Sequence, residues 1–308
     1  MPRQSAYDEG TNRAADAIRT LVIDFFRGRQ AEHAYAPAEG SVAARHSLEA
    51  RGLPGVAGLP DDPIREMWQL AATALFAAED HVLALADLLQ SEQSILGHAV
   101  AARSVIEAAG RVFWLLDPGI SVPDRVSRSL GYMWEGLEHL EALVTPLLGA
   151  APNDPRALAI RLRLAHERDD LLTAADDLGV RTQSRKGSEW AGTRPPGRRR
   201  LVVDVLTAAG QPYGDAFYNY LSGVAHGDVR RLVMYLRPAD PADSGAPSGT
   251  SSSSWAQPTM ELGEVLNVTR RAVDALVYAE RLYWSYLGWQ EVLAIDAAAA
   301  GAVAAMQP

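Results

Sequence analysis

An all-α fold, an antiparallel helical bundle with long irregular loops, is predicted by the spacing of apolar residues in this sequence. Over residues 63–89, 95–116 and 126–147, apolar side chains recur three and four positions apart, which is the period of an amphipathic helix. No stretch alternates apolar and polar residues over a useful strand length. The connections between these three long helices are short, which favours antiparallel packing.

The predicted helices have residues typical of helix boundaries at their ends. Asp, Ser and Thr accept hydrogen bonds from the first free amide groups, Pro tolerates the first turn, and Gly ends a helix. The expected boundary residues are Asp61, Asp62 and Pro63 for the first long helix, Ser91 or Ser94 and then 117–119 for the second, Pro123 for the third, Asn153, Asp154, Pro155 and Gly179 for the fourth, and Thr259 for the last.

One bundle domain with less regular flanks is the expected organisation. Residues 1–62 are interpreted as an N-terminal helix over 11–29 followed by a Pro- and Gly-rich irregular connection. Residues 63–296 form the predicted helical bundle domain, and 297–308 form a tail. Within the domain, 181–200 holds seven Arg or Lys against one acid and predicts a basic mobile loop, while the Ser-rich segment 238–258 predicts disorder.

Composition excludes several classes of function. The 308 residues carry a net charge of -9, which argues against a general nucleic-acid coat but not against a local basic patch. The absence of cysteine excludes disulfides, Cys-ligated zinc, iron–sulfur clusters and thiol catalysis. The N-terminus has no apolar signal-peptide core, and no run of about 18 apolar residues occurs, so we expect a cytoplasmic protein with no membrane association.

The stretch 213–237 contains the first candidate site. At 100° per residue, one narrow stripe of a helix holds Asp215, Asn219, Ser222, His226 and Arg230. An apolar stripe runs beside it, so the polar groups are expected at the margin of the core. Polar residues at such a margin also occur as a merely hydrogen-bonded helix edge. Both interpretations stay open at this point.

Charged residues on the second and third long helices form two further candidates. Arg103, Glu107 and Arg111 are spaced four apart and share a face. This face predicts either an ion ladder along the surface or, if desolvated, an arginine held by Glu107 as an anion clamp. Arg125 and Arg128 lie on the face opposite the apolar positions of the third helix, which is usually a solvated face.

Patterns for three other kinds of catalytic site are incomplete. Glu135 and His139 are four apart and outward-facing, whereas di-iron bundles use an inward Glu and His three apart, so no metal or cofactor is predicted. The acidic pairs lack the second carboxylate that an isoprenoid cyclase would need. Ser222 and His226 could touch, but nothing supplies an oxyanion hole, which favours His226 as a general acid or base over nucleophilic catalysis.

Three segments carry a resemblance to a known group of proteins. They are HAVAARSVIEAAGRVFWLLDP (98–118), DRVSRSL (124–130) and FYNYLSGVAHG (217–227). These segments resemble a group of uncharacterised actinobacterial all-helical proteins, which is similar in outline to the HEPN superfamily. Many members of that superfamily are metal-independent ribonucleases or partners of nucleotidyltransferases. The residues that match the group's pattern are Arg103, Glu107, Trp114, Arg125, Arg128, Tyr220, Ser222 and His226.

The chain departs from the ribonuclease pattern of that superfamily. Those ribonucleases carry an Arg, usually followed by a polar residue, and then a His four to six residues after the Arg. Arg161 and His166 have this spacing, but the intervening Leu162 is apolar. No Arg stands at the corresponding offset before His226.

Binding of a phosphate-bearing ligand such as RNA or a nucleotide, with metal-independent cleavage or transfer as its extension, is the leading functional hypothesis. We expect Arg103, Glu107, Ser222 and His226 to line one polar pocket. In this pocket Arg103 would neutralise the charge of the ligand, Glu107 would orient Arg103, and His226 would exchange a proton with the ligand. The basic segment 181–200 would attract the ligand. The other expected ligand-binding residues are Arg111, Asn219, Tyr220, Arg230, Arg125 and Arg128.

Two hypotheses from other classes are kept. One is a small-molecule enzyme of specialised metabolism with an isoprenoid-cyclase-like fold, in which the aromatic residues near Trp284 form an apolar wall. The other is a non-catalytic helical interaction module that forms a homodimer through an exposed apolar helix face.

Overall fold

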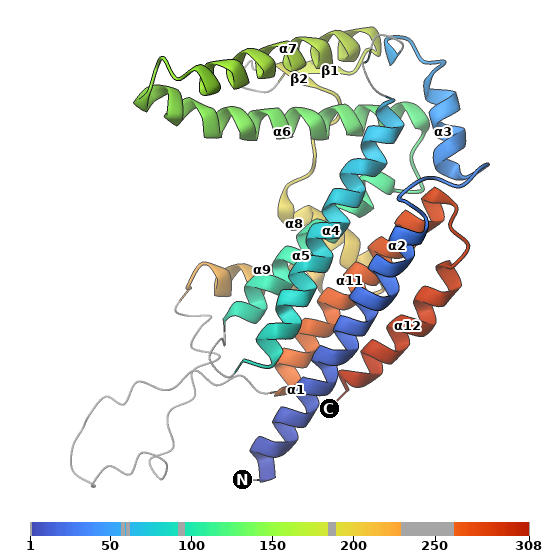
Figure 1. Ribbon diagram of the computed structural model, residues 1–308, viewed down its shortest axis with the longest axis vertical. Helices are drawn as coiled ribbons and strands as arrows, with labels where there is room; N and C mark the ends of the chain where they lie inside the picture. Colours follow the sequence, from blue (N-terminus) through green and yellow to red (C-terminus); the bar gives the residue numbers. More distant parts are fainter. Residues whose placement is uncertain are drawn as a thin grey trace.

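Long helices lying side by side form the body of the protein, and a two-helix arm crosses one end of it (Figure 1). The computed structural model describes residues 2–56, 59, 62–91, 96–183, 189–228 and 262–307, and in this part of the chain the expected all-α fold is confirmed. None of the helices in these ranges combines the length and apolarity needed to cross a bilayer.

The N-terminal rod is continuous and longer than the sequence pattern predicts. It runs through α1 (Pro2–Arg19), the π-helical segment η1 (Thr20–Arg27) and α2 (Gly28–Glu32). Its face of Ala14, Ile18, Val22 and Phe26 is fully buried, and α1 packs against α4 and α11. The rod is therefore part of the core.

The expected irregular connection over 31–62 contains a further helix, α3 (Val42–Ala50). Ser41 caps it, because the Ser41 Oγ accepts a hydrogen bond from the Ala44 amide at 3.1 Å. The helix has only nine residues and buries only Ala43 and Ala50, so its apolar period is too short to read in the sequence.

Two central helices follow, and the predicted start is confirmed for the first but not for the second. α4 (Pro63–Leu89) begins at Pro63 as predicted, with the Asp62 carboxylate accepting from the Ile64 amide at 2.9 Å. α5 (Gly97–Leu116) begins after both expected caps, because Leu96 occupies the cap position and provides no side-chain hydrogen bond. Ser91 precedes it in the connection, and Ser94 lies outside the described residues. α5 packs against both α4 and α11.

The arm consists of α6 (Val122–Ala150) and α7 (Pro155–Asp177), which form a hairpin. The predicted boundaries are confirmed within a residue or two. Asp154 caps α7, and Gly179, with φ +67°, follows its end.

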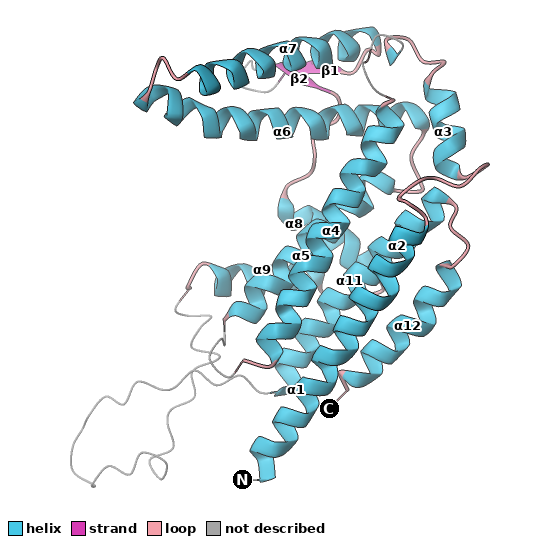
Figure 2. Cartoon of the chain, in the orientation of Figure 1, coloured by secondary structure: helices cyan, strands magenta, loops and turns pink. Residues whose placement is uncertain are grey.

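A small antiparallel sheet of β1 (Arg181–Gln183) and β2 (Glu189–Ala191) lies against the arm (Figure 2). Strands of three residues are consistent with the expectation that no strand of useful length occurs. The sheet does correct the expectation of a mobile loop over 181–200, of which 184–188 lie outside the described residues. Trp190 is buried against Trp134, with ring centroids 6.2 Å apart. The chain after β2 passes so close to α6 that a Cβ on Gly131 would lie 1.9 Å from the Thr193 carbonyl oxygen.

The C-terminal third contains α8 (Arg198–Ala208), α9 (Gly214–Ala225), α11 (Leu262–Leu287) and α12 (Val292–Ala305). The helix expected over 213–237 ends at Ala225, and Gly227 follows with φ +66°, which a continuing helix does not allow. Residues 229–261, with Arg230, Thr259 and the Ser-rich segment 238–258, lie outside the described residues. The expected tail from residue 297 continues as helix α12 to Ala305.

Two carboxyl groups meet in the centre of the body, a feature that the sequence does not indicate. Glu79 of α4 and Glu280 of α11 have no exposed surface. The Gln30 Nε2 donates to Glu79 Oε1 at 2.8 Å and to Glu280 Oε1 at 3.1 Å, and the Trp284 indole donates to Glu280 Oε2 at 2.8 Å. Arg27 donates to Glu79 Oε2 at 2.9 Å. Burial, followed by the neighbouring Glu79, raises the pKa of Glu280 well above its usual range.

A raised pKa means that Glu280 keeps its proton at neutral pH, and replacing Glu280 by Gln tests this protonation state. A carboxyl group with a raised folded-state pKa contributes stability below its unfolded pKa and loses it as pH rises through the folded pKa. Glu280→Gln keeps a neutral group of the same shape, so Tm should rise by roughly 5 °C in alkaline buffer and change little in acidic buffer. Thermal melts across this pH range measure both effects.

The matched control is Glu39→Gln, which changes an exposed glutamate and should leave the pH dependence of Tm intact. A uniform loss of stability in Glu280→Gln at every pH would contradict a protonated Glu280.

Candidate functional site

A hollow of about 690 Å³ opens between the start of α8 and the side of α9. Three consecutive arginines from the first turn of α8 form one wall. The lining residues are Gly197, Arg198, Arg199, Arg200, Val203, Asp215 and Tyr218. In the sequence, the run of Pro195, Pro196 and Gly197 before three arginines and the apolar positions from Leu201 onward is the signal for this helix start.

The first turn of α8 is an unusual place for cations. Gly197 occupies the cap position in an extended conformation and has no side chain to accept from the first amide groups. These amides form the positive end of the helix dipole, which favours anions and disfavours Arg198, Arg199 and Arg200. The local electrostatics therefore favour an anion in the hollow.

Arg199 and Arg200 each contact one partly exposed carboxylate. Arg199 forms a forked pair with Asp215 of α9, with an Nη2 to Oδ2 distance of 2.6 Å and a second contact from Nε to Oδ1. The hydrogen bond from Arg199 lowers the pKa of Asp215. Arg200 donates through Nε to Asp204 Oδ2 at 2.7 Å, one turn along α8. The Arg199 and Arg200 side chains are 61% and 72% exposed, so both pairs are weakly stabilising.

Glu107 connects three helices behind the hollow. Its Oε1 accepts from the Arg103 Nε at 2.7 Å, and its Oε2 lies 3.8 Å from the Arg198 Nε. The Arg103 Nη2 donates to the Tyr218 hydroxyl at 3.3 Å, and its guanidinium lies 5.2 Å from the centre of that ring. The spacing of Arg103 and Glu107 thus produces a mostly buried pair. Arg111 lies apart from it, over the Tyr132 ring at 5.9 Å.

The polar stripe predicted on α9 is only partly at this hollow. Ser222 follows Tyr218 by one turn on the same face but is not among the lining residues. His226 is exposed and occupies the position just after the last residue of α9. Its side chain has no hydrogen-bond partner in the described part of the chain. The structure therefore brings Arg103 and Glu107 to the back of the hollow and leaves Ser222 and His226 outside its lining.

The remaining candidates on α9 lie on other surfaces. Tyr220 stacks on Phe217, with ring centroids 6.3 Å apart, and faces a separate hollow together with Glu264. Burial, followed by the charge of Glu264, raises the pKa of Tyr220. Asn219 is half-buried, and Arg230 lies outside the described residues. Tyr220 is thus not part of the arginine-lined hollow.

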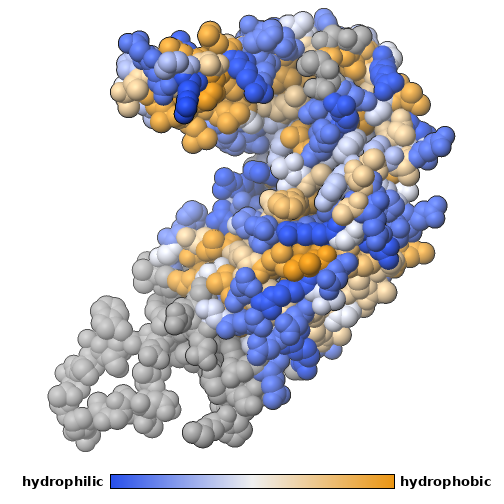
Figure 3. All heavy atoms as spheres, in the orientation of Figure 1, coloured by the Kyte–Doolittle hydropathy of each residue, from blue (hydrophilic) through white to orange (hydrophobic). Residues whose placement is uncertain are grey.

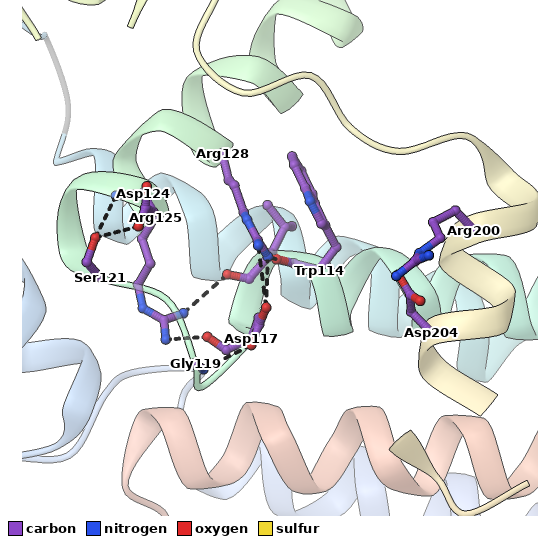
Figure 4. A network of polar contacts seen from close by, with 10 residues as sticks. Trp114, Asp117, Gly119, Ser121, Asp124, Arg125, Arg128, Arg200 and Asp204 are labelled. Atoms are coloured by element: carbon purple, nitrogen blue, oxygen red, sulfur yellow. Dashed lines mark hydrogen bonds and ion pairs between the residues drawn. The ribbon is translucent and has the colours of Figure 1, made fainter. Parts of the chain in front are cut away.

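Arg125 and Arg128 hold the end of α5 instead of facing solvent or this hollow (Figure 4). Arg125 is only 2% exposed and donates to the backbone oxygens of Asp117 at 2.6 Å and Leu115 at 3.4 Å. Arg128 donates to the Trp114 carbonyl and lies over the Trp114 ring at 5.4 Å. The expectation of a solvated face is wrong, because these side chains donate hydrogen bonds to the carbonyls that the end of α5 leaves free. Burial lowers the pKa of Arg125.

Comparisons of the chain with family models, with curated proteins and with solved structures found no match. In the described part of the chain, no group of three or more His, Asp or Glu side chains is arranged to hold a metal ion. The interpretation of the site therefore rests on its own geometry and charges.

The fork between Arg199 and Asp215 can be tested directly. We expect the Asp215 carboxyl to titrate below the usual range of an aspartate, because the Arg199 hydrogen bonds favour the charged form. Arg199→Gln should return the pKa toward its ordinary value. Carboxyl-carbon chemical shifts followed by NMR through acidic pH measure it. An identical Asp215 titration in the two proteins would mean that the fork does not persist in solution.

Proposed function

We propose that the protein binds a phosphate-bearing ligand, a nucleotide or RNA, in the hollow at the start of α8. The observation that carries this proposal is the run of Arg198, Arg199 and Arg200 in the uncapped first turn of a helix. A bound phosphate would accept from the Arg198 and Arg199 amides, because the Arg200 amide already donates to the Gly197 carbonyl, and it would also neutralise the arginines. The chain as a whole is acidic, so this local positive charge is the more specific signal.

The arginines retain donors for such a ligand. Arg200 contacts Asp204 through Nε alone, and a guanidinium has five N–H groups. Arg198 is 63% exposed, and within the described residues its only charged contact is the 3.8 Å approach to Glu107. A phosphate has more charge and more acceptor oxygens than a carboxylate and competes well for exposed guanidinium groups.

Tyr218 supports a nucleotide rather than inorganic phosphate alone. It lines the hollow beside the arginines, and its hydroxyl is held by Arg103. An aromatic ring fixed next to a phosphate site is suited to stack on a base. Arg103 and Glu107 would then be positioning residues for Tyr218 and Arg198.

Cleavage by His226 requires a longer ligand. His226 follows Tyr218 by eight residues, which is roughly 12 Å along a helix axis. A mononucleotide held by the arginines would end short of that position, whereas an RNA strand lying along α9 would reach it. Ser222 lies between the two on the same face. Proton exchange by His226 is therefore proposed only for an RNA ligand.

The aromatic residues near Trp284 do not favour the small-molecule enzyme. Trp284 has no exposed surface. It packs against Phe25 at 5.5 Å and Trp289 at 5.7 Å between ring centroids. This cluster is interior packing next to Glu280, not the wall of a ligand cavity.

Arg200→Gln is expected to weaken binding of a nucleoside triphosphate and of a short RNA strand by about tenfold, because it removes a charge-assisted hydrogen bond. Isothermal titration calorimetry and fluorescence anisotropy at low salt measure this loss. The matched control is Arg51→Gln, an exposed arginine elsewhere on the body, which should leave binding nearly unchanged. Equal losses in both variants, or no binding of either probe to the unaltered protein, would contradict the proposal.

His226→Gln separates binding from cleavage. If His226 exchanges a proton with bound RNA, the variant should retain RNA affinity while losing most of any strand cleavage, typically at least a hundredfold. Gel analysis of end-labelled RNA with and without a chelator measures the cleavage. Absence of cleavage in the unaltered protein, with binding intact, would restrict the function to binding.

A further inference from the structure

The arm exposes a row of large apolar side chains on α6. Leu140, Leu143 and Leu147 are three and four residues apart and therefore share one face of the helix. They are 48%, 68% and 58% exposed. Isolated exposed leucines are ordinary, but a contiguous row of them marks an interaction surface.

The same face of the arm continues onto α7 and into a hollow at the base of the arm. This hollow, of about 420 Å³, is lined by Leu140, Met133 and Leu137 of α6 together with Arg163 and Glu167 of α7. These residues place the leucine row and the Arg163 side of α7 on one face. In the space-filling view, apolar surface is visible on the arm where it overhangs the notch that separates it from the body (Figure 3).

Charges along this side of α7 are divided between its two ends. Arg156, Ile160, Arg163, Glu167 and Asp170 are spaced four, three, four and three apart, so they form one stripe. The half nearer the tip of the arm is basic, and the half nearer the base is acidic. Ile160, which is 43% exposed, adds an apolar residue between the two arginines.

The central Arg163 and Glu167 of this stripe are complementary to their own antiparallel image. If two α7 helices lie antiparallel about a two-fold axis near residue 165, Arg163 of one faces Glu167 of the other, and the reverse holds. Within one chain, the Arg163 Nε donates to Glu167 Oε1 at 2.5 Å, but Arg163 is 80% exposed. An exposed pair of this kind rearranges at little cost. Opposite charges would thus fix the register, while the leucine rows on α6 supply apolar area beside the α7 contact.

We propose that this face of the arm is an interface with a second copy of this chain, arranged around a two-fold axis. The occupant is a second copy because Arg163 and Glu167 can each face the opposite charge of an antiparallel copy, and the exposed leucines beside them offer apolar area. This surface is separate from the arginine-lined hollow at α8, so the inference goes beyond the proposed ligand binding and does not depend on it.

Leu143→Glu tests the apolar part of the interface. Sedimentation velocity of the full chain over a wide concentration range should show a dimer for the unaltered protein. Leu143→Glu buries a charge in each half of the interface and should weaken the dimer by about a hundredfold. The matched control is Leu162→Glu, because Leu162 is 72% exposed on α7 but lies off the stripe of Ile160 and Arg163. Far-UV circular dichroism verifies that both variants keep their helices.

A monomer at every concentration, or a dimer that Leu162→Glu disrupts and Leu143→Glu does not, would overturn the proposal. The first result would mean that the leucine row, if it is an interface, binds a different protein. The second would place a dimer contact elsewhere on the chain.

Mixing two charge-reversed variants tests the register. Arg163→Glu puts two acids opposite two acids in its own dimer, and Glu167→Arg puts two arginines opposite two arginines, so each should dimerise about tenfold more weakly than the unaltered protein. A mixture of the two variants restores opposite charges across the axis and should form the mixed dimer in preference to either self-dimer. If the mixture associates no better than its components, the antiparallel register is wrong.

Discussion

The carboxyl pair of Glu79 and Glu280 constrains the whole body. Two acidic groups without exposed surface need hydrogen-bond donors and an opposite charge from the protein itself. Apart from the Trp284 indole of α11, those partners come from the N-terminal rod, whose Gln30 bridges both groups and whose Arg27 supplies the opposite charge. The hydrogen bonds fix how far the rod, α4 and α11 are shifted along one another. α5 packs against α4 and α11, so its position follows from this centre.

The position of α5 in turn determines the candidate site. Glu107 projects from α5 toward both Arg103 and Arg198, and Arg103 reaches Tyr218 on α9. Three helices are thereby held in one arrangement around an exposed arginine cluster. The buried members of the network provide rigidity, while the exposed arginines keep the freedom to exchange a carboxylate for a phosphate. A local positive charge in an acidic protein follows from this arrangement.

The arm is anchored by close backbone approach and by helix-end contacts, not by its leucine row. Gly131 lets the chain at Thr193 pass directly over α6, and Arg125 and Arg128 bind the free carbonyls at the end of α5. The outer half of the arm is left with apolar side chains that nothing in the described part of the chain covers. The hollow at α8 and the arm face thus lie on separate surfaces, so the proposed ligand binding and the proposed self-association can be tested by separate mutations.

Interactions between residues close in sequence were predictable from the sequence: the helical periods, the Asp62 cap, the stop at Gly179 and the pairing of Arg103 with Glu107 all depend on neighbours within about one turn. The bridge from Gln30 to Glu280 spans 250 residues, and no local pattern indicates it. The burial of Arg125, the placement of His226 outside the hollow and the meeting of Arg198 with Glu107 likewise depend on how helices pack. The sequence by itself determined which of the long segments are helical and where most of them begin or end, but not the short helix α3 or the helical tail. Only the tertiary structure decided which polar side chains meet, because that depends on contacts between helices far apart in the chain.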